Sequence, residues 1–413
     1  MLTRRQLLTR ALKGSSILAL GNGTLVPRFL ASTAMAAEAG KDNVLVIIEM
    51  TGGNDGLNMV IPYGDDQYYR VRPTIGIGKD KVIKVDDYIG LHPALNGFDP
   101  LLKNNELAIV QGVGYPNPNR SHFESMDVWQ SGDPGRENKT GWVARSSTHL
   151  QAQRGGVPAL QVGPEKLPLA LRGADKAVAS INNQAPLQFR WGAANPKDEE
   201  DRKKFLIQMV GQERPTKEDS LLDFVQRQQL QTYSRLDELQ KLLENRGQDG
   251  RFPATPLGQK MQLVGQLIER GFGMRVFYLA IDGFDTHSGQ LAAHTKLFGE
   301  LSGAVGALFN ALRPNGHDKR VMVLTYSEFG RRIAENGSGG TDHGAGSCLF
   351  VAGPGVKGGP ANKHPSLTKT DQGDLIHHTD FRQVYATILD GWLGCESKAI
   401  LGEKFEPLPF LKG

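Results

Sequence analysis

The sequence has little cysteine, with only Cys348 and Cys395 among its 413 residues. So few thiols argue against a thiolate metal site, which needs several cysteines close together. The two cysteines could pair in an oxidising compartment. Cys348, however, lies in the apolar run 348–351, which is typical of a core position. We therefore expect a buried free thiol at Cys348.

The sequence also lacks a long apolar run and a basic stripe interleaved with aromatic residues. No segment has the ~20 consecutive apolar residues that a membrane-spanning helix needs. The net charge of +4 depends on residues 1–36, which contain no acidic residue and five basic ones, namely Arg4, Arg5, Arg10, Lys13 and Arg28. Without that segment the net charge is −1. We therefore expect no nucleic-acid partner.

The N-terminal segment 1–36 has the pattern of a cleavable export signal. Paired arginines, Arg4 and Arg5, precede a short apolar region, and Ala34-Met-Ala36 provides a small-x-small cleavage site. The paired arginines favour the twin-arginine export machinery over the general route. The alternative is an amphipathic helix or an uncleaved anchor. We predict a periplasmic or otherwise exported mature chain, residues 37–413, with no membrane span after processing.

Apolar runs that alternate with helical patterns predict the fold class. The strand candidates are 44–48, 107–113, 274–281, 321–326 and 348–352, and each is apolar enough to be buried on both faces. The helix candidates are 256–270, 291–312 and 381–393. This alternation predicts a single α/β domain with a mostly parallel central sheet between two helical layers. The charged segment 195–248 is expected to be a helical insertion or cap.

Polar side chains follow four of these strands, where each strand ends. The candidates are Asp55 after the first strand, Arg120, Ser121 and His122 after the second, Asp285 and His287 after the third, and Glu328, Asp342 and His343 after the fourth. In an open parallel sheet such strand ends share one edge, where ligands bind. We therefore expect these side chains to converge on one pocket.

Carboxylates and imidazoles together suit one or two divalent cations, with Zn²⁺ or Mn²⁺ favoured. The predicted ligands are Asp55, Asp285, His287, Glu328, Asp342 and His343. Paired ions would clamp the attacking and leaving oxygens of a displacement at phosphorus or sulfur. The candidate catalytic residues are Ser121, as nucleophile, and His122; Arg120 and Asn54 are the candidate substrate-binding residues.

Several of these residues also have a simpler interpretation. Asp55 could serve an Asn-Asp-Gly turn. Ser121 could be the N-cap of a helix over 123–130, because Glu124 stands at the capping-box spacing. Glu328 could form an ion pair with Arg331 or Arg332 on the next turn.

The chain resembles a bacterial family of exported, mostly uncharacterised domain-of-unknown-function proteins that carry a twin-arginine signal. The matching motifs are GGNDGLN (52–58), LHPAL (91–95), GYPNPNRSHFESMDVWQSG (114–132), GFDTH (283–287), SEFGRR (327–332), ENGSGGTDHG (335–344) and TDFR (379–382). That family is grouped with the alkaline phosphatase and sulfatase superfamily. The resemblance implies an alkaline-phosphatase-like fold.

By that resemblance, Asp55 is similar to the superfamily's first-strand metal aspartate, and Ser121 lies where its nucleophile lies. Asp285 with His287, and Asp342 with His343, resemble its further ligand pairs. Two departures stand out: the superfamily usually spaces its aspartate and histidine more widely than Asp285 and His287, and its Asp-His pair directly follows a strand, a place held here by Ser327 and Glu328, with Asp342 and His343 one loop later. Either Glu328 replaces one ligand, or Asp342 and His343 have another role.

Three functions remain open at this stage. The first is an exported metal-dependent hydrolase of anionic esters, phosphate or sulfate, on a small molecule or a glycan. The second is a non-catalytic metal- or glycan-binding relative on the same scaffold. The third is a phosphoryl or sulfuryl transferase.

Overall fold

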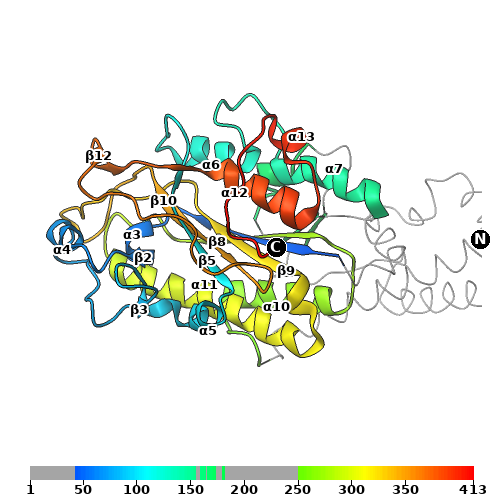
Figure 1. The fold of residues 1–413 in the computed structure, drawn as a ribbon, viewed down its shortest axis with the longest axis horizontal. Coiled ribbons are helices and arrows are strands. Elements are labelled where there is room, and N and C mark those ends of the chain that lie inside the picture. The colour runs from blue at the N-terminus through cyan, green and yellow to red at the C-terminus, as the bar shows by residue number, and fades with distance from the viewer. Residues whose placement is uncertain (1–41, 155–158, 164, 174–178, 182–249) are drawn as a thin grey trace, which may run out of the picture.

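The computed structural model describes residues 42–154, 159–163, 165–173, 179–181 and 250–413 (Figure 1). The predicted signal segment 1–36 and the predicted insertion 195–248 lie outside these residues. Among the described residues, no helix is both long and apolar enough to cross a bilayer.

A central sheet of nine strands organises the described part of the chain. Its order is β11-β5-β10-β9-β1-β8-β6-β7, and β14 pairs with β5. The strands are β1 (Val44–Thr51), β5 (Leu107–Gly114), β6 (Ala159–Val162), β7 (Ala179–Ile181), β8 (Val276–Asp282), β9 (Val321–Tyr326), β10 (Ser347–Ala352), β11 (Gly359–Pro360) and β14 (Thr379–Asp380). The five predicted strands are therefore confirmed, together with a mostly parallel sheet.

One predicted strand runs in the opposite direction. β10 pairs antiparallel with both β5 and β9, whereas β1 is parallel to β8 and β9. An apolar run indicates burial on both faces but not direction. The connection 327–346 contains no helix. A parallel return usually needs a helical crossover, and without one the chain returns antiparallel.

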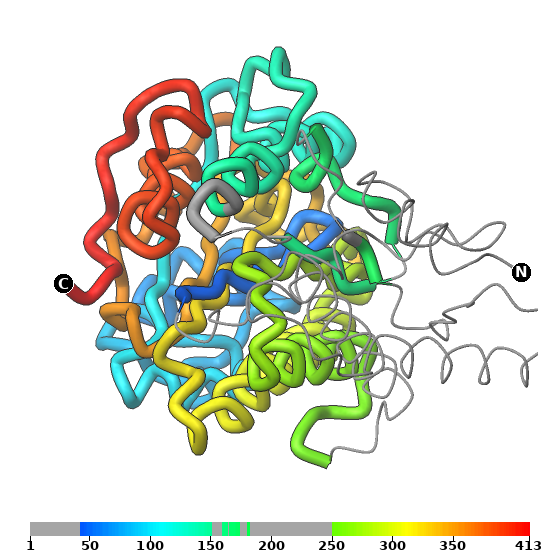
Figure 2. The backbone as a smooth tube through the Cα atoms, turned by 90° about the vertical axis from the view of Figure 1, so that its right-hand side faces the viewer, coloured from blue at the N-terminus to red at the C-terminus, as the bar shows by residue number. Residues whose placement is uncertain are grey.

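Helices cover both faces of the sheet (Figures 1 and 2). One layer contains α5 (Asp99–Lys103), α10 (Pro256–Glu269) and α11 (Gln290–Leu312), and the other contains α6 (His122–Ser131), α7 (Trp142–Arg154), α12 (Phe381–Ile388) and α13 (Ser397–Leu401). The predicted helix 381–393 is α12 followed by a π-helical turn, Leu389–Leu393. Alternate residues of β1 enter two separate cores, Val46 and Ile48 on one side and Leu45 and Ile47 on the other.

The two cysteines lie in different cores. Cys348 belongs to the α10–α11 side and Cys395 to the α12 side, and both are buried free thiols. The expectation of a core thiol at Cys348 is confirmed.

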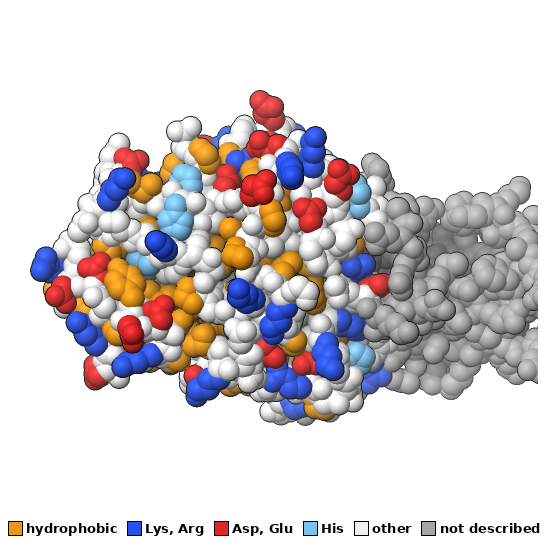
Figure 3. Space-filling view, in the orientation of Figure 1, with side chains coloured by type: hydrophobic (Ala, Val, Ile, Leu, Met, Phe, Trp, Pro, Cys, Tyr) orange, Lys and Arg blue, Asp and Glu red, His pale blue; other side chains and the backbone are white. Residues whose placement is uncertain are grey.

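Besides short 3₁₀ helices, smaller elements complete the described chain. They are α3 (Gly56–Met59), α4 (Asp66–Val71), the three-stranded sheet of β2 (Val60–Ile61), β4 (Gly90–Leu91) and β3 (Ile83–Lys84), and the hairpin of β12 (Thr370–Asp371) and β13 (Asp374–Leu375). On the face drawn in Figure 3, basic and acidic side chains are interspersed, with hydrophobic side chains between them.

Candidate metal centre

The carboxyl ends of β1, β8 and β9 meet at one edge of the sheet. Thr51 at the end of β1 is in register with Asp282 at the end of β8. Beyond them the two chains approach closely, because a Cβ on Gly52 would lie 2.3 Å from the backbone nitrogen of Asp285. Gly52 also has φ +117, which strongly favours glycine. The loops after these strands therefore share one small region.

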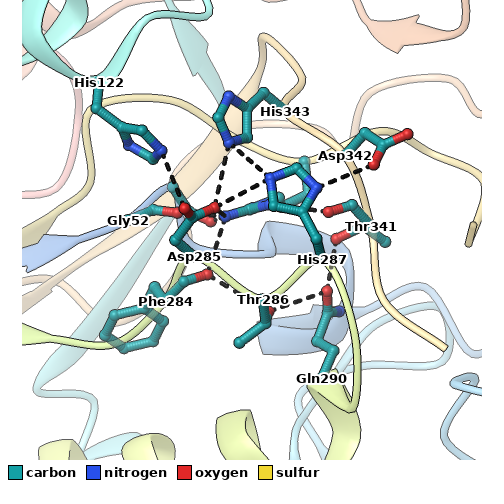
Figure 4. A network of polar contacts seen from close by, with 12 residues as sticks. Gly52, His122, Phe284, Asp285, Thr286, His287, Gln290, Thr341, Asp342 and His343 are labelled. Carbon is teal, nitrogen blue, oxygen red and sulfur yellow. Dashed lines mark hydrogen bonds and ion pairs between the residues drawn. The ribbon is translucent and has the colours of Figure 1, made fainter. Parts of the chain in front are cut away.

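Asp285 lies at the centre of three imidazoles (Figure 4). Its Oδ1 is 3.2 Å from Nε2 of His343 and 3.2 Å from Nε2 of His287, and its Oδ2 is 3.4 Å from Nε2 of His122. One donor atom from each of His122, Asp285 and His343 lies within 4.8 Å of the others, close enough to share a metal ion. The strand-end argument named all four residues, but it assigned His122 to catalysis rather than to this group.

The opposite ring nitrogen of each of two histidines is held by an acceptor. Nδ1 of His122 lies 2.8 Å from Oε1 of Glu328, and Nδ1 of His343 lies 2.9 Å from the carbonyl oxygen of Arg120. A carbonyl or carboxylate oxygen only accepts, so Nδ1 carries the hydrogen in both rings. Each Nε2 then points toward Asp285, as a lone pair when the ring is neutral and as an N–H donor when the ring is protonated. The hydrogen bond with Glu328 also raises the pKa of His122.

The Nδ1 atom of His287 is also held by an acceptor. Its Nδ1 lies 3.0 Å from Oδ1 of Asp342, which Asn336 also approaches at 3.2 Å. The hydrogen bond from His287 lowers the pKa of Asp342. Asp342 thus orients a histidine, as Glu328 does. Carboxylates in this outer position are common around metal-bound histidines.

The donor set fits a divalent cation. Nε2 of His287 and Nε2 of His343 are 3.0 Å apart, so with both rings neutral and Nδ1 protonated their lone pairs would face each other, and a proton or a metal cation between or beside them relieves that repulsion. Nε2 of His122 is buried and has no hydrogen-bond partner among the described residues. Three imidazoles and one carboxylate are ligands that suit Zn²⁺ or Mn²⁺.

Arg331 holds the loops of the centre together. Its fully buried guanidinium donates to Oδ1 of Asp285 at 2.7 Å, to the Gly53 carbonyl at 2.7 Å and to the Thr341 carbonyl at 2.8 Å. It also donates to the Gly52 carbonyl. Desolvation opposes ionisation of Asp285, but hydrogen bonds from Arg331 and His343 lower its pKa to about 2. Asp285 is therefore a carboxylate at neutral pH.

Asp55, in contrast, is bound elsewhere. Its carboxylate is fully buried and accepts two hydrogen bonds from Arg72, at 2.6 and 3.0 Å. Nε2 of Gln290 and the backbone nitrogen of Leu57 are further donors. These four donors occupy both oxygens, so Asp55 has no free lone pair for a metal ion. The structure gives it a buried ion pair and a helix cap in place of the predicted metal contact.

The remaining predicted residues are not among the four side chains that converge at the centre. Ser121 precedes α6 at the N-cap position, but its side chain makes no capping hydrogen bond. Arg120 pairs with Asp374 through its guanidinium. Asn54 is buried, and its Nδ2 lies 2.9 Å from the sulfur of Met59. The predicted capping box at Ser121 is not formed, because Glu124 instead accepts from Asn119 at 2.7 Å.

Sequence reasoning missed the buried Arg72 and assigned the buried Arg331 to the wrong partner. Glu328 was expected to pair with Arg331 or Arg332 if it was not a ligand, yet it contacts His122 while Arg331 pairs with Asp285. Arg72 gave no signal, because it lies at the end of the short helix α4, far from any motif. In the sequence, the only indication of a buried structural arginine was a basic residue within a glycine-rich loop, as at Arg331.

The chain belongs to the family described as "Protein of unknown function (DUF1501)", whose model matches residues 104–391. A search of curated proteins found no match.

Solved structures are similar only distantly. The PsFucS1 sulfatase from Pseudoalteromonas sp. has 13% identity and a TM-score of 0.40, over 92% of this chain and 74% of that one. An alkaline phosphatase superfamily protein from Vibrio parahaemolyticus has 8% identity and a TM-score of 0.37, over 91% and 77%. A sulfatase of uncertain assignment from Bacteroides thetaiotaomicron has 13% identity and a TM-score of 0.35, over 89% of this chain and 76% of that one.

Proposed function

We propose that this protein is an exported metal-dependent hydrolase of phosphate or sulfate esters. The observation that supports it most is the convergence of three Nε2 atoms on the Asp285 carboxylate, with each opposite Nδ1 held by an acceptor. His122, Asp285, His287 and His343 would hold the ion. When bound, a divalent ion supplies Lewis-acid polarisation of an ester oxygen. Glu328, Asp342 and Arg331 orient the ligands.

The residues beside the centre suit an anionic ester. Ser121 is next to His122 in the chain, and its hydroxyl is not used for capping, which keeps it available as a nucleophile. Arg120 contributes a guanidinium that is 39% exposed, and it is fixed to the centre by its own carbonyl. A guanidinium recognises phosphate and sulfate oxygens through paired hydrogen bonds.

Metal content of the purified mature protein tests the centre. We expect stoichiometric Zn²⁺ or Mn²⁺ by elemental analysis in the wild type and loss of the ion in Asp285→Ala and His343→Ala. The matched control is His317→Ala, since His317 precedes β9 at the opposite edge of the sheet. Full occupancy that survives both substitutions would contradict the ligand assignment.

A second candidate is a non-catalytic metal-binding protein, favoured by the absence of a hydrogen bond between the Ser121 hydroxyl and any base among the described residues. Turnover of aryl phosphates and aryl sulfates discriminates the two. The hydrolase predicts that Ser121→Ala lowers kcat at least about 100-fold while the metal content is unchanged. No turnover by metal-loaded wild type would favour the binding protein. Turnover unaffected by Ser121→Ala would leave Ser121 without a catalytic role.

Export is part of the same proposal, through the twin-arginine machinery. It is supported by Arg4 and Arg5 and by the small residues Ala34 and Ala36. Replacing Arg4 and Arg5 together by lysine should leave the precursor in the cytoplasm, as cell fractionation would show. Unchanged export of that variant would exclude this route.

A further inference from the structure

Two arginines from different loops share one buried carboxylate beside the candidate centre. Asp374 is 2% exposed and begins β13. Nε of Arg120 donates to its Oδ2 at 3.0 Å, and Nη1 of Arg332 lies 3.2 Å from its Oδ1. The β12–β13 hairpin presents this carboxylate through a two-residue turn, Gln372 and Gly373, whose φ angles of 52° and 86° suit a type I′ turn.

The charges of this group do not balance. One carboxylate stands against two guanidiniums, so the group carries one surplus positive charge. Arg332 is within ion-pair distance of Oδ1, but that oxygen has no hydrogen bond among the described residues. Arg332 is therefore held near Asp374 by charge, while its Nη1 donates to the Gln372 carbonyl. The side chains of Arg120 and Arg332 are 39% and 30% exposed, so an anion in solution can reach them.

This arginine pair is joined to the metal-binding loop at two points. The Arg120 carbonyl accepts from Nδ1 of His343 at 2.9 Å, and the backbone nitrogen of Arg332 donates to the Asp342 carbonyl at 2.9 Å. Each arginine is thus one hydrogen bond from a residue of the centre. The surplus charge is held at a fixed position relative to the ion site, which is what recognition of a second group on the same substrate requires.

We propose that Arg120 and Arg332 form a subsite for a second anionic group of the substrate, so that the preferred ester carries an additional sulfate, phosphate or carboxylate. This inference rests on the proposed function, because it places the ester group at the Asp285 centre. The buried Asp374 carboxylate fixes the spacing of the guanidiniums without neutralising both. Guanidiniums prepositioned in this way bind an anion without first being ordered.

Non-hydrolysable sulfonates test the subsite separately from turnover. We would measure binding of benzenesulfonate and 1,3-benzenedisulfonate to metal-loaded protein by calorimetry. Wild type is expected to bind the disulfonate roughly tenfold more tightly. Arg332→Gln should remove this preference and leave benzenesulfonate affinity and metal content unchanged, and Arg332→Lys should restore part of it. The control is Arg313→Gln, whose side chain is 38% exposed and pairs with Glu106 and Asp318 elsewhere.

Equal affinity of wild type for the two sulfonates, a preference that survives Arg332→Gln, or no binding of either compound would each overturn the subsite. Failure of the proposed function gives a different result. If the protein selects the disulfonate but hydrolyses neither phenyl phosphate nor phenyl sulfate, the subsite is supported and the proposed hydrolase activity is contradicted.

Discussion

Glu328 is the single residue whose contacts explain most about the candidate centre. Its Oε1 lies 2.8 Å from the Gly52 nitrogen and 2.8 Å from Nδ1 of His122, and its Oε2 lies 2.9 Å from the Ser327 hydroxyl. The carboxylate is fully buried, two residues beyond the end of β9. It therefore links the β1 loop to the first turn of α6 and fixes the direction of one imidazole.

Glu328→Gln should weaken metal binding about 10-fold to 100-fold, the range expected for loss of an outer carboxylate. The amide keeps the volume but is a poorer acceptor for Nδ1 of His122. Competition with a chromophoric chelator would measure the affinity. Glu335→Gln is the control, since the half-buried Glu335 carboxylate accepts from Thr74 and Ile75 and contacts no imidazole of the centre. Unchanged affinity would show that Glu328 does not support a ligand.

Glu49 should make stability depend on pH. It is buried in β1, with Gln130 Nε2 at 2.7 Å and the Tyr326 hydroxyl at 3.2 Å. Desolvation raises its pKa from 4.5 to about 7. The folded state thus favours the protonated acid, and unfolding releases a proton between those values. This contribution to stability is fully present below pH 4.5 and is lost as the pH rises through 7.

Glu49→Gln should remove this dependence. The free energy of unfolding of the variant, relative to that of wild type, should rise by up to about 3 kcal/mol between low pH and pH ~8. Above pH ~8 the difference between the two proteins should stay constant. Urea unfolding across the pH range measures it, and Glu137→Gln on an exposed loop is the control. A constant difference between Glu49→Gln and wild type at all pH values would disprove the assignment.

At the scale of elements, the loop after β1 and the helix α4 are joined by the ion pair of Asp55 and Arg72. Both side chains are essentially unexposed. Arg72 lies at the C-cap of α4, and Asp55 is the N-cap of α3, so one pair fixes two short helices. Burial opposes ionisation of Asp55, and the neighbouring guanidinium keeps its pKa low.

Asp55→Asn should destabilise the protein by about 3 kcal/mol, because it leaves the Arg72 charge buried and unpaired. The metal content should remain that of wild type. Urea unfolding with elemental analysis of the folded variant checks both. Asp285→Asn is the contrast, since it should lose the ion. If the Asp55→Asn protein folds but contains no metal, Asp55 is a metal ligand and the assignment to Arg72 alone is contradicted.

Because the carboxyl ends of parallel strands share one edge of the sheet, the sequence could predict which loops meet. It could not predict which side chains of those loops point toward the candidate centre. It brought together Asp285, His287 and His343 because β8 and β9 flank β1 in parallel. It failed at Asp55, because the partner that captures this residue comes from α4, 17 positions along the chain. Pairing between a turn and a short helix leaves no periodic pattern.

At the scale of the whole molecule, the sheet separates the two largest of the three hydrophobic clusters in the described part of the chain. One core contains Cys348 and the other Cys395. The separation prevents the two thiols from meeting without unfolding.

Thiol titration should therefore detect no reactive cysteine in the native protein and two after denaturation, as both thiols are free and buried. Burial raises the pKa of Cys395 to about 11 and raises that of Cys348 further. Both thiols are consequently protonated and unreactive. Intact mass spectrometry of purified protein, without reductant, is the check. A mass lower by two hydrogens would reveal a disulfide and contradict the separation.

The sequence alone determined the layers, the buried strands and the family, because apolar periodicity and contiguous motifs are local properties. It also placed Asp285, His287, Asp342 and His343 at one sheet edge. The tertiary structure decided the rest. In the folded protein β10 is antiparallel to its neighbours, His122 is oriented toward the centre by Glu328, and Asp55 pairs with Arg72. These outcomes depend on which charges and lone pairs meet after packing, and each charge has more than one possible partner until the chain is folded.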